Sequence, residues 1–295
     1  MRKRICIPLM ALALLLGGCG KSASAVTEPP ETVDPYAGMV QVESGFGTLM
    51  WVEEYGEVPV NPLTAADFSD GEYIGDACTV RRGVDVSEHQ GTIDWAAAAQ
   101  SGVEFAVIRA GYRGYGTAGS LNIDPYFQNN VNGARENGID VGVYFFSQAT
   151  GAEEAAEEAE FLLELLSPYT PEAFSLPVYY DWEPITHDTA RTDGMGGDVI
   201  TECAVTFCEK IAAAGYAPGV YAYRNLGYFT YDLRELRPYR LWIAAVGDYP
   251  DFYYAHDLWQ YSYTGHVPGI ETYVDLDFWF IENTAPVPED TDASA

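Results

Sequence analysis

Short apolar runs alternate with longer amphipathic stretches between residues 81 and 283. Eight of these runs have the length and the content of β-branched and aromatic residues that are typical of strands. They are GVDVS, VEFAVIRAGY, IDVGVYFFSQ, SLPVYYDWE, APGVYAY, YRLWIAAV, DLWQYSYTG and IETYVDLDFWF. Strands that alternate with helices are typical of a parallel sheet, and eight strands are enough to close a barrel. We therefore predict an α/β chain whose main domain is a distorted TIM-like barrel.

Stretches with the residue periodicity of helices lie between the first five runs. The stretches are DWAAAAQSG, DPYFQNNVNGARENG, GAEEAAEEAEFLLELL and GDVITECAVTFCEKIAAAG. In the third stretch the acidic residues come first, and negative charge near a helix N-terminus is stabilised by the helix dipole. After Val246 the helical pattern ends. We therefore expect the last two runs to form strands with no helix between them.

Four acidic residues lie at or near the ends of predicted strands. Asp181 and Glu183 close the run SLPVYYDWE, and residues two apart on a strand point to the same side. Asp85 follows the start of the first strand, and Asp275 lies in the last one. Barrel sites lie at the C-terminal ends of the strands. Closure of the barrel would therefore bring together acids from the first, fourth and eighth strands.

Carboxyl groups that share a pocket cannot all ionise freely. Mutual repulsion and partial burial raise at least one pKa, which yields an acid able to donate a proton near neutral pH. One protonated and one charged carboxyl group are the usual requirement for cleaving a glycosidic bond. The alternative for each acid alone is a solvated loop residue, but the four together favour a glycosidase site.

The first nineteen residues are typical of a targeting segment. A basic start precedes an apolar run that is too short to span a bilayer, and the ending LGGC resembles a bacterial lipobox. We predict a signal peptide with lipidation at Cys19. Cleavage near Ala23 or Ala25 is the alternative, and either process exports the protein.

The remaining chain divides by composition. Residues 20–35 are small, polar and proline-bearing, as in a flexible linker. Residues 36–80 indicate a small strand-containing N-terminal segment, residues 81–283 the barrel, and residues 284–295 an acidic tail. No repeat of fixed period interrupts this order.

Charge and cysteine usage narrow the classes of function. Without residues 1–18 the chain has 12 basic and 44 acidic residues, a net charge of −32. Nucleic acid is excluded as a partner, because phosphate binding needs clustered lysine and arginine. Cys78, Cys203 and Cys208 are expected to be free thiols, mostly buried. Since neither zinc nor EF-hand spacing occurs, we expect no metal and no other cofactor.

A set of short motifs runs in order across residues 82–280. They are GVDVSEHQGTIDW, FAVIRAGYRGYG, NIDPYFQNNVNGA, VGVYFFSQA, PVYYDWE, GVYAY, LWIA, LWQYS and VDLDFW. In these motifs the chain resembles family 25 of the glycoside hydrolases, the Chalaropsis-type lysozymes. The resemblance implies a barrel of five βα units followed by three strands. It also implies an N-acetylmuramidase that cuts the β-1,4 bond between N-acetylmuramic acid and N-acetylglucosamine in peptidoglycan.

The resemblance further implies a role for each acid. Glu183 is the general acid that protonates the leaving sugar oxygen, and Asp181 positions the substrate acetamido group or stabilises the developing positive charge. Asp85 and Asp275 support these two and tune their pKa values. Configuration is expected to be retained, with attack either by a carboxylate or by the substrate's own acetamido group. The spacing of Asp181 and Glu183 suits the assisted route.

Aromatic side chains on the predicted strands match the apolar faces of sugar rings. For each of them the alternative to a place in the sugar groove is the barrel core. The candidates are Tyr144, Tyr221, Trp242, Trp259 and Tyr261. Trp182, between two of the acids, should face the other way, and His89 should lie near the site. Arg109 lies near the end of the second run and Arg113 directly follows it; they either hold a substrate carboxylate or, for Arg109, lie buried against an acid.

Three positions depart from the family pattern. Asp277 stands where members often have asparagine, Phe145 where they often have histidine, and Val246 where tyrosine is common. None of these changes removes a proposed catalytic acid, but Phe145 and Val246 bear on how the sugar is held. The alternatives are therefore a surface-anchored glycan-binding protein without turnover, or a glycosidase acting on another amino-sugar polymer. In the main hypothesis the protein is an exported monomer, held on the membrane by its lipid and facing peptidoglycan strands.

Overall fold

The computed structural model describes residues 34–282, and the fold reported below is that of the unit that begins at Gly38. The predicted signal peptide with Cys19, most of the linker at residues 20–35 and the acidic tail at residues 284–295 lie outside the described residues. None of the described helices is long and apolar enough to cross a membrane.

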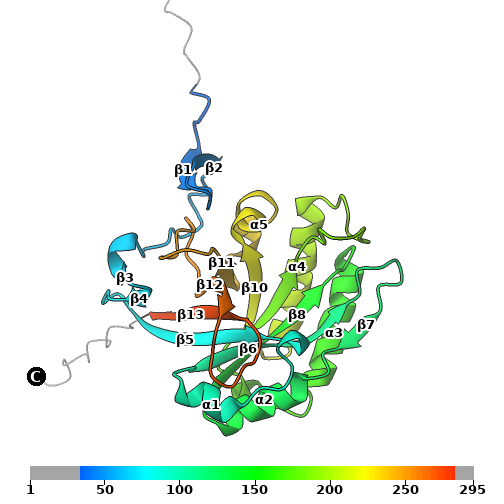
Figure 1. Ribbon diagram of the computed structural model, residues 1–295. Coiled ribbons are helices and arrows are strands. Elements are labelled where there is room, and N and C mark those ends of the chain that lie inside the picture. Colours follow the sequence, from blue (N-terminus) through cyan, green and yellow to red (C-terminus); the bar gives the residue numbers. More distant parts are fainter. Residues whose placement is uncertain (1–33, 283–295) are drawn as a thin grey trace, which may run out of the picture. The chain divides into compact units, whose positions relative to one another are not determined.

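Eight strands form a closed barrel (Figure 1). Around the barrel they are β5 (Cys78–Val86), β6 (Phe105–Arg113), β8 (Asp140–Ser147), β9 (Val178–Trp182), β10 (Pro218–Tyr223), β11 (Arg240–Ala244), β12 (Leu258–Gly265) and β13 (Val274–Glu282). The first seven of these strands pair in parallel, whereas β13 is antiparallel to both β12 and β5. The predicted α/β barrel is confirmed.

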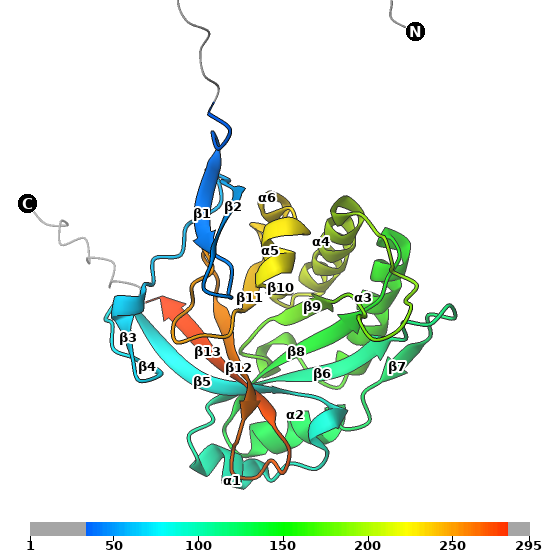
Figure 2. The ribbon, with the colours of Figure 1, turned by 45° about the horizontal axis from the view of Figure 1, so that its top comes forward.

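Helices follow the first five barrel strands and lie outside the barrel (Figure 2). They are α1 (Trp95–Gln100), α2 (Phe127–Glu136), α3 (Ala152–Leu166), α4 (Gly197–Ala213), α5 (Arg224–Phe229) and α6 (Leu233–Leu236). Helix α3 shows why they pack there: its buried residues Ala155, Ala159, Leu162 and Leu166 recur every three or four positions and so share one face. Beyond β11 the described chain contains no helix.

The alternation of side chains along the strands divides the core into two parts. Outward-pointing side chains pack against the helices, and this outer core includes Trp182, which was expected to face away from the acids. Inward-pointing side chains fill the barrel interior. They are Phe105, Val107, Tyr144, Leu176, Tyr179, Tyr221, Trp242, Ala244 and Leu258.

The segment before the barrel contains two hairpins. Strand β1 (Met39–Glu43) pairs with β2 (Leu49–Glu53), and β3 (Phe68–Ser69) pairs with β4 (Glu72–Tyr73). The hydroxyl of Tyr254, from the loop after β11, donates to the carbonyl of Glu53 and accepts from the backbone N–H of Tyr55. These bonds attach the end of the first hairpin to the barrel.

Some boundaries differ from the prediction. The last strand begins at Val274 and not at Ile270, because Gly269 has a φ of 94° and the Ile270 N–H bonds back to the Val267 carbonyl in a turn. Strand β5 begins at Cys78, before residue 81. A short strand that the sequence pattern does not reveal, β7 (Leu121–Ile123), pairs with the end of β6. Three 3₁₀ turns complete the described elements: η1 (Ala65–Asp67), η2 (Glu88–Gln90) and η3 (Pro171–Ala173).

Candidate active site

The four predicted acids meet at the carboxyl-terminal end of the barrel. Asp85 is the second-last residue of β5, Asp181 lies near the end of β9, and Glu183 directly follows that strand. Asp275 arrives from the opposite direction, because it is the second residue of β13 and pairs with Asp85 in the antiparallel register. The start of an antiparallel strand lies where its parallel neighbours end, so the C-terminal-end rule does not apply to Asp275.

These acids line a pocket of about 210 Å³. The pocket thus combines converging carboxyl groups with aromatic walls, the pairing of polar and apolar groups that orients a small ligand. Its other lining residues are His89, Arg109, Tyr144, Phe146, Tyr221, Trp242 and Gln260.

Asp181 and Glu183 are the acids with the least compensation. Asp181 is buried, and its Oδ1 meets no hydrogen-bond donor within residues 34–282. Burial raises the pKa of Asp181 well above its ordinary value, and Glu183 adds to the rise while Arg109 opposes it. Burial, followed by the charge of Asp275, raises the pKa of Glu183 to about 7. Glu183 therefore carries a proton over much of the pH range below neutrality, as a general acid requires.

Gln260 connects the other two predicted acids. Its Nε2 donates to Asp85 Oδ2 at 2.6 Å and to Asp275 Oδ2 at 3.3 Å, while its Oε1 accepts from the Tyr221 hydroxyl at 3.0 Å. Burial raises the pKa of Asp275 to about 6. The amide thus fixes two carboxyl groups and itself is fixed by a tyrosine.

A fifth acid lies next to this group. Asp277 is fully buried, and Trp242 Nε1 donates to its Oδ1 at 2.9 Å. Burial raises the pKa of Asp277 well above its ordinary value. We name the five acids the carboxylate cluster: Asp85, Asp181, Glu183, Asp275 and Asp277.

Three of the predicted aromatic residues lie at the pocket. Tyr144, Tyr221 and Trp242 point into the barrel, where the Trp242 ring meets Tyr221 and Tyr144 edge to face with centroids 4.7 and 5.9 Å apart. They are part of the barrel core and also line the pocket. Both interpretations of these residues, core and groove, therefore apply.

The structure does not place Trp259 and Tyr261 at the pocket. Gln260 lies between them and points inward, so its two neighbours on β12 point outward. Trp259 stacks on Phe278, and its Nε1 donates to the Ala245 carbonyl. Tyr261 also stacks on Phe278. We expected these two side chains to hold the sugar, but in the structure they pack in the outer core.

Arg109 is held by acids. Its Nε donates to Asp124 Oδ2 at 2.9 Å and its Nη2 to Glu88 Oε1 at 2.8 Å. The interpretation of Arg109 as buried against an acid therefore describes the structure, although the side chain also borders the pocket. Arg113, on the same strand, lies away from the pocket in the arginine cluster described below.

Sequence reasoning missed Gln260, Phe146 and Tyr263. The signal for Gln260 was its place between the two outward aromatic residues of LWQYS. Tyr263 was harder to find, because an irregularity in the β12–β13 pairing between Gln260 and Ser262 changes the alternation. Tyr263 is about half exposed, and partial burial, followed by the charges of Glu183 and Asp275, raises its pKa to about 12.

Asp277 is one of the three departures from the family pattern; the other two, Phe145 and Val246, do not line the pocket. Phe145 is fully buried and packs against Phe161 of α3, on the outside of the barrel. Val246 follows β11 and is half exposed. Cys203 and Cys208 are buried free thiols, as expected, whereas Cys78 is partly exposed.

A second group of buried charges lies where β6, α3 and the loop after β9 meet. Arg113 Nε donates to Glu158 Oε1 at 2.7 Å, and Arg191 Nη2 to Glu154 Oε1 at 2.5 Å. Burial raises the pKa of Glu158 to about 7, while hydrogen bonds from Ser147 and Arg113 oppose the rise. We name Arg113, Glu154, Glu158 and Arg191 the arginine cluster.

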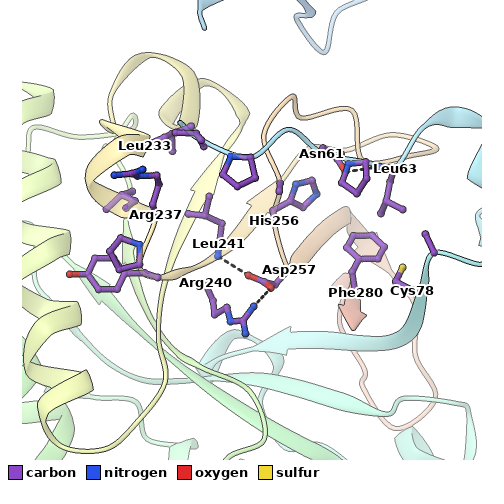
Figure 3. A pocket seen from close by; sticks show the side chains of 18 residues that line it. Asn61, Leu63, Cys78, Leu233, Arg237, Arg240, Leu241, His256, Asp257 and Phe280 are labelled. Atoms are coloured by element: carbon purple, nitrogen blue, oxygen red, sulfur yellow. Dashed lines mark hydrogen bonds and ion pairs between the residues drawn. The ribbon is translucent and has the colours of Figure 1, made fainter. Parts of the chain in front are cut away.

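A larger cavity, of about 630 Å³, lies at the opposite end of the barrel strands (Figure 3). Its lining includes Arg240 at the start of β11 and Asp257 just before β12. Asp257 accepts from Arg240 Nη1 at 2.7 Å and from the backbone N–H of Leu241 at 3.3 Å. Among the described residues Asp257 is the one acid in this lining, and it is paired with Arg240. This cavity therefore lacks the acid pair found at the other end of the barrel.

Comparisons with known proteins agree with this geometry. The model of the family "Glycosyl hydrolases family 25" matches residues 84–270. The curated autolytic lysozyme of Clostridium acetobutylicum is 27% identical over 198 residues, which are 66% of this chain and 55% of that protein. The chain therefore spans about half the length of this relative.

Solved structures share the fold. A family 25 glycosyl hydrolase from Bacillus anthracis superimposes with a TM-score of 0.57 at 22% identity, covering 74% of this chain and 94% of that one. The modular autolysin LytC from Streptococcus pneumoniae, in complex with a synthetic peptidoglycan ligand, gives 0.58 at 23% identity over 82% of this chain and 56% of its own. Because the family model covers more than half of the sequence, including Asp85, Asp181 and Glu183, the chain belongs to family 25 of the glycosyl hydrolases.

Proposed function

We propose that this chain hydrolyses the β-1,4 bond between N-acetylmuramic acid and N-acetylglucosamine in peptidoglycan. The observation that carries the proposal is Glu183, a proton-bearing carboxyl group beside the buried carboxyl group of Asp181 in an aromatic pocket. Membership of the family supports the reaction class. The names of the relatives, an autolytic lysozyme and an autolysin with a peptidoglycan ligand, support the substrate.

In the proposed reaction Glu183 is the general acid. Its proton passes to the leaving sugar oxygen as the bond from that oxygen to the anomeric carbon breaks. Asp181 positions the acetamido group of the muramic acid or stabilises the positive charge that develops at the anomeric carbon. Asp85 and Asp275 support this pair through Gln260, which donates to both of them.

We propose retention of configuration through the substrate's own acetamido group. Asp181 and Glu183 are two residues apart and lie on one side of β9, so they do not flank the sugar from opposite faces. In this route the acetamido oxygen bonds to the anomeric carbon, and water later displaces it while Glu183 takes up the water's proton. Asp181 then has no need to reach the anomeric carbon.

We also propose that the protein is exported and lipidated at Cys19, and that it acts on the wall of its own cell. The basic start, the apolar run and the ending LGGC support this location. Metabolic labelling with a fatty acid tests it, with the C19A variant as the matched control. Release of active, lipid-free enzyme from cells that carry the intact gene would contradict the proposal.

The activity is tested on purified peptidoglycan. The expected result is the release of reducing ends, which borohydride reduction and mass spectrometry identify as muramic acid, and their absence with the E183Q variant. Reducing ends on glucosamine would place the cut at the other glycosidic bond. Binding to the wall without turnover would favour a glycan-binding protein, and turnover of a different polymer a different glycosidase.

A further inference from the structure

One carboxyl oxygen of Asp277 receives no hydrogen bond from the other described residues. Its Oδ1 accepts from Trp242 Nε1 at 2.9 Å. Its Oδ2 is buried and meets no donor within residues 34–282. A buried polar atom without a partner is costly and calls for an explanation.

The side chains of Asp277 and Asp85 interact closely enough to form a hydrogen bond if one of them carries a proton. In the antiparallel register Asp277 lies opposite Gly83, and Asp85 lies opposite Asp275, so the Asp277 side chain reaches diagonally to Asp85. Ionised carboxylates only accept hydrogen bonds. A hydrogen bond between two carboxyl groups therefore requires a proton on one of them.

The surroundings of the pair favour that proton. Asp275 on β13 is a further acid, and Tyr261 of β12 and Tyr179 of β9 also interact with Asp277. The titratable groups that interact with Asp85 include Tyr144, Tyr221 and Tyr263. The direct donors to the pair, Gln260 and Trp242, are neutral.

The arginines of β5 do not offset this negative charge. Arg82 extends over the Phe278 ring on the outer face, and Arg81 pairs with Asp140 towards the start of the strand. Burial, followed by the charges of Asp277 and Asp275, raises the pKa of Asp85 well above its ordinary value.

We propose that Asp85 and Asp277 share one proton, and that Asp277 is a positioning residue that holds Asp85 for the reaction proposed above. The shared proton does what the amide of an asparagine would do at position 277, because an amide also accepts from Trp242 and donates to Asp85. The difference is that the proton can leave. Once it leaves, Asp85 loses a donor and faces a second negative charge, so the site depends on pH at this pair as well as at Glu183.

The proton is observed directly by carbon NMR of protein labelled at the aspartate carboxyl carbons. Signals that disappear in D85N and in D277N assign the pair. At pH 6 we expect the pair to show the chemical shift of a protonated acid. Asp140 provides the ionised reference, because a hydrogen bond from Ser175 and the adjacent Arg81 lower its pKa. Ionised shifts for both Asp85 and Asp277 at pH 6 would overturn the proposal. This measurement needs no turnover, so it stands even if peptidoglycan is not hydrolysed.

The positioning role is tested by two substitutions of similar size. D277L removes the bond to Asp85, and we expect kcat to fall by about ten- to a hundredfold with little change in KM, the effect of losing one hydrogen bond to a charged group. D277N should restore most of that loss. It should also lose activity less steeply than the wild type above the pH at which the NMR signal of the pair titrates. A folded D277N that falls as far as D277L, or that keeps the wild-type pH profile through that titration, would contradict the role.

Discussion

The carboxylate cluster and the arginine cluster each contain a glutamate with a pKa of about 7, yet they are built differently. Glu158 accepts from Arg113 at 2.7 Å and from Ser147 at 2.6 Å, and its side chain has no exposed surface. Glu183 lines an open pocket, and its largest electrostatic neighbour is another acid. In the arginine cluster donors of the protein compensate the carboxylate, whereas in the carboxylate cluster Glu183 faces a pocket.

The comparison shows that a shifted pKa does not by itself identify a catalytic residue. Structural ion pairs also perturb pKa values, because burial disfavours any charge. The distinguishing property is access: Glu183 lines a cavity of about 210 Å³, whereas the oxygens of Glu158 accept from Arg113, Ser147 and the backbone N–H of Gln148. We therefore propose a functional role for Glu183, which lines the pocket, and a stabilising role for Glu158, whose oxygens are hydrogen-bonded.

The largest expected effect comes from replacing each of the two glutamates, Glu183 and Glu158, by glutamine. E183Q should lower kcat on peptidoglycan by between about a hundredfold and ten-thousandfold, because the amide cannot donate a proton to the leaving oxygen. Its thermal midpoint should stay close to that of the wild type. Residual activity above a tenth of the wild-type value would show that another group supplies the proton.

E158Q should reverse this pattern. Removing the negative partner weakens the compensation of the buried Arg113, which still contacts Glu157 at 3.2 Å and Glu154 at 4.0 Å. The loss of this charged hydrogen bond should destabilise the fold by about 2 kcal/mol. Urea unfolding measures the loss, and kcat per folded molecule should remain that of the wild type. If E158Q lowered kcat instead of stability, the distinction between the two clusters would fail.

The pH dependence should differ between activity and stability. As a general acid Glu183 must be protonated, so activity should be full below about pH 7 and fall about tenfold per unit above it. Both glutamates have folded pKa values above the ordinary 4.5, so the folded protein binds more protons than the unfolded chain between pH 4.5 and 7. Stability should therefore fall as the pH rises through this window. A rate that rises above pH 7 would exclude Glu183 as the acid.

The smallest effect compares two buried tyrosines. Y221F removes the donor to Gln260 Oε1 and should lower kcat about fivefold, equivalent to about 1 kcal/mol. Y180F removes a partner of Ser147 in the neighbourhood of Glu158, so it should lower the stability by about 1 kcal/mol and leave kcat unchanged. Steady-state kinetics and urea unfolding on both variants give the comparison, and equal effects on kcat would refute it.

Much of the fold was readable because local patterns were strong. Strand runs, helix periods and the paired acids of SLPVYYDWE led to the barrel and to three acids at strand ends. The position of Asp275 at the pocket depends on the direction of β13, and the alternation of side chains along a strand does not reveal that direction. The outward orientation of Trp259 and Tyr261 followed from Gln260 pointing inward, and one residue of register reverses such an assignment.

The partners of buried charges were the least predictable part of the site. The sequence marks Asp277 only as a departure from a family pattern, because its contacts with Trp242 and Asp85 depend on three strands that are far apart in sequence. Arg109 and Arg113 lie on the same strand, yet one borders the pocket and the other belongs to the arginine cluster. Short-range pattern cannot distinguish such neighbours.

The reversed direction of β13 has a consequence for engineering. Because Glu282 pairs with Cys78, the first residue of β5, the described chain leaves the barrel at the end opposite the pocket. A reporter or a cell-surface display module joined after this strand would emerge away from the entrance for the glycan. The turn between β12 and β13, in contrast, joins two strands on the entrance side, so exchanging that single loop would reshape two adjoining walls at once.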